Sequence, residues 1–497
     1  MNEKMHDALN QISDAHLNEA EHYHKRRFPW WIGAVAAILA VVIALSALQG
    51  VQNPSIATRP TVTSPSRSPV PESGSIVDMS TLGLANLLAA PEYPEMLAKP
   101  NMEDYPNYSD YDAQLMAWQQ SQNAQYDQPY GYADSLTDFF LESIRQFLDT
   151  EENSAYSPLN VYMALAMLAE TSDGNSRQQI LDVLGLSSIE ALREQVGHVW
   201  NAHYSNDGAT TLLLGSSLWL DEAFSFHRET VDRLASTYYA APFHGDLGTD
   251  AMDQQLQTWL NANTGGLLDT KNVKLDPNTV FSLATTVYFA AGWEDSFWEM
   301  NNQEMVFHCA EGDLTTTFMR QTYTGCTYYW GENFGAIQLD LSGENAMWLI
   351  LPDEGCTVAD ILASDDYLRM TANPDGWKNK GAYEVHLSLP KFDVTSSTDL
   401  IQGLKAMGIT DVFDSNISDF TPLTDTPRLY MSGATHAARV VIDEEGCLAA
   451  AFTVLIFGVE SEPPEYEELH FTLDRPFLFV VSSRDNLPLF TGVVAQP

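Results

Sequence analysis

Basic residues are scarce in this chain. Lysine and arginine number 24 against 67 aspartates and glutamates, which gives a formal net charge of −43. Phosphate backbones and anionic lipid surfaces repel such a molecule, so we do not expect nucleic acid as a partner. The acidity fits solubility outside the cell, or steering of a basic protease.

Cysteine is also scarce, and its spacing matches no metal or redox motif. The four cysteines form no CxxC pair and have no histidine at metal-ligand spacing, so neither a zinc ribbon nor a redox site is predicted. We expect no metal and no cofactor. Free thiols are the simplest state, and one disulfide in an oxidising compartment stays open. The four are Cys309, Cys326, Cys356 and Cys447.

Short catalytic motifs are missing as well. The chain has no GxSxG elbow, no HExxH, no Walker loop and no GxGxxG after a strand. We therefore expect no enzyme and assign no catalytic residue. Apolar residues make up 45% of the chain, which is enough for a substantial core.

One long segment near the N-terminus carries no charge. The run from Trp30 to Leu48 is long enough to cross the hydrocarbon layer, and Lys25, Arg26 and Arg27 precede it. This pattern predicts a cytoplasmic leader (1–28) and a single-pass anchor (29–49), with the C-terminal domain outside the cell membrane. A cleaved signal peptide, which would release a secreted protein, is the alternative.

Two further segments precede the main domain. Residues 50–75 are rich in Pro, Ser and Thr and predict a stiff, extended spacer. Residues 76–133 predict an N-terminal extension that packs partly against the domain. The anchor and spacer fit a bacterial cell surface.

Hydrophobic periodicity changes at the start of the segment 134–497. Helical patterns occur at 135–148, 159–170, 252–262 and 398–407, and RQQILDVLG ends at Gly185 with a helix stop. Runs typical of strands are TLLLGSSLWL, TVFSLATTVYFA, AMWLILP, YEVHLSLPKF, ARVVID and FLFVV. Without regular βαβ alternation, this order predicts an α+β domain.

Several ordered motifs in this segment resemble the serpin family of serine protease inhibitors. The segment NSAYSPLNVYMALAMLAETSDGNSRQQILDVLG (153–185) is similar to a family segment in both order and spacing. Further similar motifs are SLWLDE, WLNANTGG, YFAAGW, LILPDEG, LSLPKF, FTLDRPFLFVV and LFTGVVAQP. The resemblance implies a serpin domain over 134–497, with helices packed around three β-sheets and an exposed reactive loop at about 444–470.

The resemblance also implies a function. Serpins act as suicide substrates of serine endopeptidases: the protease forms an acyl-enzyme, and the cleaved loop inserts into the main sheet and distorts the captured enzyme. Expected partners are elastase-like, subtilisin-like, chymotrypsin-like or glutamyl-specific serine proteases, with cysteine proteases as a further class. The inhibitor is expected to be a monomer. The alternative is a non-inhibitory serpin that acts as a surface binding or chaperone-like module.

The loop must become a buried strand, which requires small or apolar residues at every second position. Cys447, Ala449, Ala451, Thr453 and Leu455 would face inward. Relative to the family, Cys447 replaces Thr or Ser and Leu448 replaces Glu. The predicted hinge comprises Glu444, Glu445, Gly446, Cys447, Ala449, Ala450, Ala451 and Thr453.

The reactive bond is placed by counting from the hinge. Seventeen positions from Glu444 put the cleaved bond between Glu460 and Ser461. The stretch to Pro476 is longer than in common serpins, so three other bait residues stay open. These are Val459, Phe457 and Ile456.

Opening of the sheet is expected to depend on a hydrogen-bonded latch. By resemblance, Ser157 and His436 match the family's shutter cluster, and Asn160 stands where Ser is common. Thr285 stands where the family has Asn, which predicts a different wiring. The alternative for His436 is an ordinary core histidine.

Overall fold

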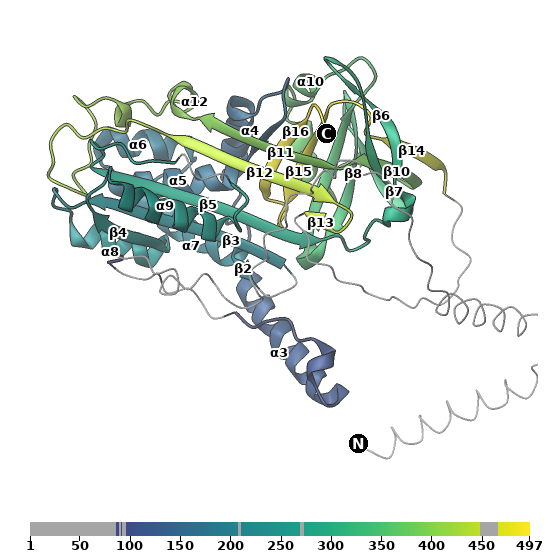
Figure 1. Ribbon diagram of the computed structural model, residues 1–497, viewed down its shortest axis with the longest axis horizontal. Helices are drawn as coiled ribbons and strands as arrows, with labels where there is room; N and C mark the ends of the chain where they lie inside the picture. Colours follow the sequence, from purple (N-terminus) through teal and green to yellow (C-terminus); the bar gives the residue numbers. More distant parts are fainter. Residues whose placement is uncertain (1–85, 89–90, 92–95, 207–209, 269–272, 448–465) are drawn as a thin grey trace, which may run out of the picture. The chain divides into compact units, whose positions relative to one another are not determined.

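The computed structural model describes residues 86–88, 91, 96–206, 210–268, 273–447 and 466–497 (Figure 1). No helix in these ranges is long and apolar enough to span a membrane. The predicted leader (1–28), anchor (29–49) and spacer (50–75) lie outside the described residues. All four cysteines are free thiols in this structure.

One sheet has seven strands, and the runs predicted around Leu214, Val287 and Val440 form three of them. The two longest, β3 and β5, pair antiparallel from Thr210 and Ala291 to Leu220 and Phe281. The sheet order is β11 (Phe392–Asp399), β12 (Thr435–Asp443), β13 (Gly446–Cys447), β5 (Phe281–Gly292), β3 (Thr210–Asp221) and β2 (Ser205–Asn206), with β4 (Ala240–Gly245) beside β3.

The other sheet has nine strands. Its order is β1 (Ser154–Tyr156), β16 (Pro488–Val494), β15 (Phe477–Ser482), β9 (Asn345–Pro352), β8 (Phe334–Leu341), β7 (Gly312–Trp330), β10 (Lys380–Pro390) and β14 (Glu468–Thr472), with β6 (Gln303–Cys309) beside β7. Only the end of β7 pairs with β8, from Tyr328 to Trp330. The three expected sheets therefore appear as two bonded networks, because this short pairing joins two of them.

The predicted helices are present, and local sequence explains their ends. The helix α5 begins at Pro158 after Ser157, whose side chain accepts a bond from the amide of Asn160. The helix α6 ends at Val183, and Gly185 follows with φ +68°, the conformation that glycine tolerates. The helices are α3 (Tyr108–Tyr126), α4 (Leu136–Phe147), α5 (Pro158–Thr171), α6 (Gly174–Val183), α7 (Ile189–His203), α8 (Arg228–Thr237), α9 (Asp250–Asn263), α10 (Val358–Leu362), α11 (Asp366–Ala372) and α12 (Ile401–Ala406).

Figure 1 shows α5 to α9 gathered around β3, β4 and β5, while the nine-stranded sheet forms the other half of the domain. The core is continuous between the halves. It includes α5 residues such as Leu159 and Tyr162, and nine-stranded-sheet residues such as Trp348 and Phe479. The helix α5 is buried over almost its whole length, because both β5 and β16 pack against it.

The segment 76–133 contacts the domain where it is described. The amide of Leu88 donates to the carbonyl of Pro242 (2.8 Å), and the amide of His244 donates to the carbonyl of Asn86 (3.0 Å). These bonds pair the segment with the edge strand β4. Farther along, the side chain of Gln125 in α3 donates to the carbonyl of Asn201 (2.9 Å) in α7.

The predicted loop range overlaps two strands. Its first residues include β13, and its last residues, 468–470, form the start of β14. The sequence analysis was wrong to count these last residues as loop, because β14 pairs with β10 in parallel register.

Candidate functional site

A seam in the seven-stranded sheet separates β5 from β12. Within the described ranges, no backbone pair joins these two strands directly. The two residues of β13 lie between them, antiparallel to both: Cys447 pairs with Ile442 on one side and Ala291 on the other. Among the described residues, β13 is therefore the strand that enters the seam, and it runs antiparallel to both neighbours.

A pocket follows the seam beyond β13. One wall consists of Val287, Tyr288 and Phe289 from β5, and the opposite wall is formed by the stretch 437–440 of β12. Cys447 lines one end of the pocket, and Phe490 of β16 also contributes. A strand with small inward side chains fits such a pocket better than one with large or charged side chains.

Gly446 fixes how β13 enters the seam. Its φ is +145°, and an added Cβ would lie 2.3 Å from the carbonyl oxygen of Ala291 and 2.7 Å from the Cα of Gly292. Both contacts are with backbone atoms, which cannot rotate away. Any other residue here would push the hinge away from β5.

Cys447 is the first inward residue of the predicted hinge. Its side chain is 3% exposed. Burial, with the nearby charge of Asp443, raises the pKa of the thiol to about 12. The thiol therefore stays neutral and acts as a small apolar group at the place where the family has Thr or Ser.

The hinge is held at its start by Glu444. Its carboxylate pairs with the ammonium of Lys391 and accepts a hydrogen bond from the side chain of Asn302. Burial alone would raise the pKa of Glu444, but the bonds from Lys391 and Asn302 outweigh it and hold the pKa below its usual value. The carboxylate is thus charged at neutral pH, although the residue is buried.

Backbone groups around Glu444 are also engaged. The indole N–H of Trp293 donates to the carbonyl of Asp443 (2.9 Å), and its amide donates to the carbonyl of Glu445 (3.1 Å). The amide of Phe297 donates to the carbonyl of Glu444 (3.2 Å). The turn between β12 and β13 is therefore anchored to the end of β5.

The predicted latch residues lie together at the N-terminus of α5. The amide of Ser157 donates to Nε2 of His436 (3.0 Å), and its hydroxyl donates to the carbonyl of Leu489 (2.7 Å). Burial lowers the pKa of His436 to about 4. The neutral ring can therefore accept the bond from Ser157, which a protonated nitrogen could not do.

Thr285 and Asn160 both differ from the residues expected in the family, and their side chains contact each other. The hydroxyl of Thr285 donates to Oδ1 of Asn160 (2.7 Å), and Nδ2 of Asn160 donates to the carbonyl of Thr285 (3.2 Å). In the family the hydroxyl side chain lies on the helix and the amide side chain on the strand. Here the amide of Asn160 lies on α5 and the hydroxyl of Thr285 lies on β5. The start of α5 consequently holds both flanks of the seam, β5 through Asn160 and β12 through Ser157.

The sequence analysis missed a buried acidic group near the C-terminal end of α5. The carboxylate of Glu170 is 1% exposed and binds the guanidinium of Arg193 through two bonds (2.7 and 2.8 Å). Arg233 (3.1 Å) and the hydroxyl of Tyr238 (3.0 Å) complete its shell. Every partner is internal, so the group ties α5 to α7 and α8 and has no free bonding capacity for a substrate.

Comparison with known protein families identifies the family of the chain that contains this seam. The family model described as Serpin (serine protease inhibitor) matches residues 134–497. The chain belongs to the serpin family.

Individual serpins support the assignment at low identity. Alpha-1-antiproteinase 2 of Equus caballus is 26% identical over 377 residues, which cover 73% of this chain and 87% of that protein. Corticosteroid-binding globulin of Oryctolagus cuniculus is 27% identical over 388 residues, which cover 74% and 96%. The crystal structure of the thermophilic serpin tengpin in its native state has a TM-score of 0.66 at 26% identity, covering 75% of this chain and 95% of tengpin.

The rest of the predicted serpin hinge lies outside the described residues. This applies to Ala449, Ala450, Ala451 and Thr453. It applies equally to the reactive bond at Glu460 and Ser461, and to the alternative bait residues Val459, Phe457 and Ile456.

Proposed function

We propose that this serpin is a suicide-substrate inhibitor of serine endopeptidases. The observation that carries the proposal is the seam, in which Gly446 and Cys447 lie between β5 and β12 and no other described residue joins those strands. After cleavage, the residues that follow Cys447 can continue β13 into the seam.

The energy of insertion is large enough to drive the trap. About ten new backbone hydrogen bonds, at ~1 kcal/mol net each, rival the whole stability of a domain, about 5–15 kcal/mol. The acyl bond joins the protease to the residue before the cleaved bond, so insertion moves the enzyme along the sheet and distorts its active site. The inhibitor itself contributes no catalytic group.

The target class follows from the bait residue. A bond between Glu460 and Ser461 suits a glutamyl-specific protease, Val459 an elastase-like one, and Phe457 a chymotrypsin- or subtilisin-like one. Cysteine proteases are a further class that the same acyl chemistry allows. We propose that the inhibitor works as a monomer.

A non-inhibitory binding role is the second candidate. One relative is named corticosteroid-binding globulin, and one similar solved structure is thyroxine-binding globulin. In such a serpin, proteases would cut the loop without being trapped.

The test mixes the purified full-length chain with elastase-like, subtilisin-like, chymotrypsin-like and glutamyl-specific proteases. We expect an SDS-stable complex with one of them, and a released C-terminal fragment whose mass identifies the bait residue. Thr453→Arg would place a charge on the inward face and should convert the inhibitor into a substrate. Ala450→Arg, on the outward face, is the matched control and should still form the complex. Cleavage by the whole panel without a complex would refute inhibition for those classes.

We also propose that residues 29–49 anchor the chain in the cell membrane, with the serpin domain outside and a bacterial surface as its setting. The uncharged run after Lys25, Arg26 and Arg27 supports this proposal. Recovery of the full-length mass in the membrane fraction, with the domain accessible to added protease, is expected. Release of a chain that begins after residue 49 would instead indicate a cleaved signal and a secreted inhibitor.

A further inference from the structure

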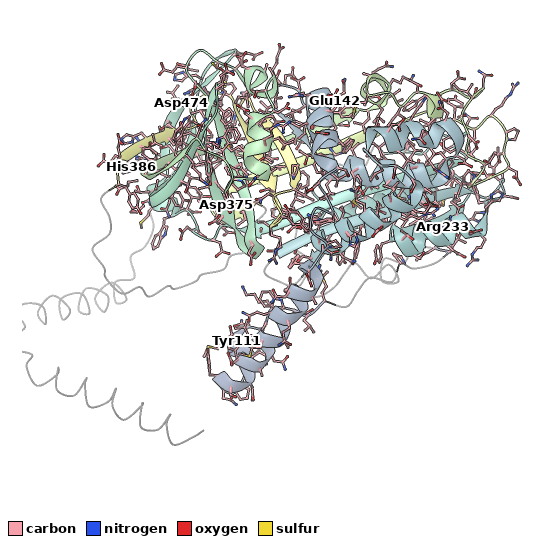
Figure 2. The ribbon with its side chains drawn as sticks, turned by 180° about the vertical axis from the view of Figure 1, so that it is seen from behind. Tyr111, Glu142, Arg233, Asp375, His386 and Asp474 are labelled. Carbon is pink, nitrogen blue, oxygen red and sulfur yellow. The ribbon has the colours of Figure 1, made fainter. Side chains whose placement is uncertain are left out.

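Four ligand-type side chains form a ladder on the outer face of the pair β10 and β14. The strands are parallel, with Glu384 opposite Glu468 and His386 opposite His470. Residues two apart on a strand point to the same face, so the four side chains share one surface. Figure 2 shows His386 at the margin of the domain.

Three of these side chains converge. Ligand atoms of Glu384, His386 and Glu468 all lie within 4.8 Å of one another. Nε2 of His386 is 3.6 Å from a carboxylate oxygen of Glu384. One imidazole nitrogen and two carboxylates form a ligand set that suits Zn²⁺ and related ions, whereas Ca²⁺ and Mg²⁺ prefer oxygen ligands alone.

The neighbours of His386 orient its ring for coordination. Its Nδ1 lies 3.1 Å from the hydroxyl of Thr322 in β7, and its ring stacks on His470 with centroids 4.9 Å apart. When Nδ1 donates its proton to Thr322, Nε2 presents a lone pair toward the two carboxylates. Metal-binding histidines in proteins are commonly held by such a second bond.

Electrostatics on this face also favour a cation. Glu384 and Glu468 lie directly opposite each other on neighbouring strands, where like charges destabilise pairing. A divalent ion between them would turn this repulsion into attraction. The side chains of His386 and Glu384 are 28% and 35% exposed, so an ion can reach them from solvent.

We propose that Glu384, His386 and Glu468 bind a divalent transition-metal ion of the Zn²⁺ type, with water in the fourth position. The ligands come from two strands, so the bound ion cross-links β14 to β10. The strand β14 is an edge strand, and in the described residues β10 is the strand it pairs with. The ion therefore holds the strand that follows the predicted reactive loop.

The sequence analysis expected no metal because it searched for local spacing. Here the ligands are brought together by strand pairing, and His386 and Glu468 are distant in the chain. The signal that could have revealed the site is the repeated Glu-x-His pattern, present at 384–386 and again at 468–470.

The test titrates Zn²⁺ into the metal-free full-length chain by calorimetry, after the accessible thiols have been blocked with N-ethylmaleimide. We expect one saturable site, which Glu468→Gln and His386→Gln abolish and Thr322→Val weakens about 10-fold. His308→Gln is the matched control, because His308 pairs with Asp313 (2.7 Å) on the same sheet but outside the cluster, and it should leave the site intact. Ca²⁺ and Mg²⁺ should not compete.

A second readout separates coordination from simple charge pairing. Hydrogen exchange of the β14 amides should slow when Zn²⁺ is added to the wild type and should not change in Glu468→Gln. The proposal is overturned if Zn²⁺ does not bind, or if it binds equally to the wild type and to Glu468→Gln. Neither measurement uses a protease, so the result is independent of the inhibition test.

Discussion

The two sheets of this serpin differ in how completely their strands are paired. In the nine-stranded sheet, β15 pairs with β9 on one side and β16 on the other, and every residue of β15 and β9 is buried. In the seven-stranded sheet, β12 pairs with β11 along its length but with only two residues of β13 on its other side. Within the described residues, β15 and β9 are therefore paired on both sides, whereas most of β12 has no partner on the side that faces β5.

This difference shows where a conformational change can occur. Strands that are paired on both sides and buried on both faces move only if the domain unfolds. Backbone groups along the seam can instead gain partners when a strand enters. In the proposed insertion mechanism the movement takes place at this seam, and the N-terminus of α5 bonds to both of its flanks.

The largest expected effect concerns the pH dependence of the latch. His436 has a pKa of about 4 in the folded state because of burial, against about 6.5 when unfolded. As the pH falls, His436 is therefore protonated in the unfolded chain before it is protonated in the folded one. The contribution of the neutral ring to the free energy of unfolding is present above pH 6.5 and is lost as pH falls to about 4. The loss amounts to about 3 kcal/mol for a fully buried group.

The measurement compares urea unfolding of the wild type and His436→Gln at pH 7.5 and pH 4. Glutamine can still accept the bond from Ser157 but cannot take up the proton. Between pH 7.5 and pH 4, the free energy of unfolding should fall by about 3 kcal/mol more in the wild type than in the variant. An equal loss in both proteins would show that His436 does not act as the sensitive group in the latch.

A matched pair of glycine substitutions would test the comparison directly. An added Cβ at Gly492 would lie 2.5 Å from the carbonyl oxygen of Ser154 and 2.4 Å from the ring of Phe479, inside the nine-stranded sheet. With no space to relax, Gly492→Ala should lower the free energy of unfolding by about 1–3 kcal/mol. An added Cβ at Gly446 would lie equally close to the backbone of β5, but the hinge residues can move out of the seam.

We therefore expect Gly446→Ala to change global stability by less than about 1 kcal/mol, and to raise the alkylation rate of Cys447 at least about tenfold. Mass spectrometry of the labelled peptide measures the rate, with Cys356 as the internal reference. If Cys447 stays protected in Gly446→Ala, the seam does not release the hinge, and the contrast between the two sheets fails.

The strands that are buried on both faces were the easier part to predict from sequence. Runs such as AMWLILP are apolar throughout because β9 is buried on both faces. The strand β7 escaped notice because polar runs at 315–317 (TTT) and 320–322 (RQT) interrupt it, and β14 because it follows directly on the predicted loop. The pattern of amino acids identifies burial, but it does not reveal which strands pair.

The hinge and latch were predictable mainly through the resemblance. Residue types at Ser157 and His436 identify the cluster, and the structure adds that Glu444 pairs with Lys391. No local pattern gives that pairing, since Lys391 lies between β10 and β11 and Glu444 lies in the turn between β12 and β13, far apart in the chain. The exchange between Asn160 and Thr285 could be stated only as two separate departures, because their contact depends on how α5 crosses β5.

The smallest expected effect is the coupling energy between the side chains of Asn160 and Thr285. It also sharpens the comparison most, because these residues link α5 to the β5 flank of the seam. Asn160→Ser replaces the amide acceptor of the Thr285 hydroxyl with a shorter side chain, and Thr285→Asn replaces the hydroxyl with a longer one, so each breaks the fit of the bond and should cost about 1 kcal/mol. The double variant restores the family arrangement and should recover about 0.5–1.5 kcal/mol relative to the sum of the single losses. Thermal unfolding of the four proteins measures this coupling. Additive losses would show that the two side chains act separately, and α5 would then hold the β5 flank of the seam through packing alone.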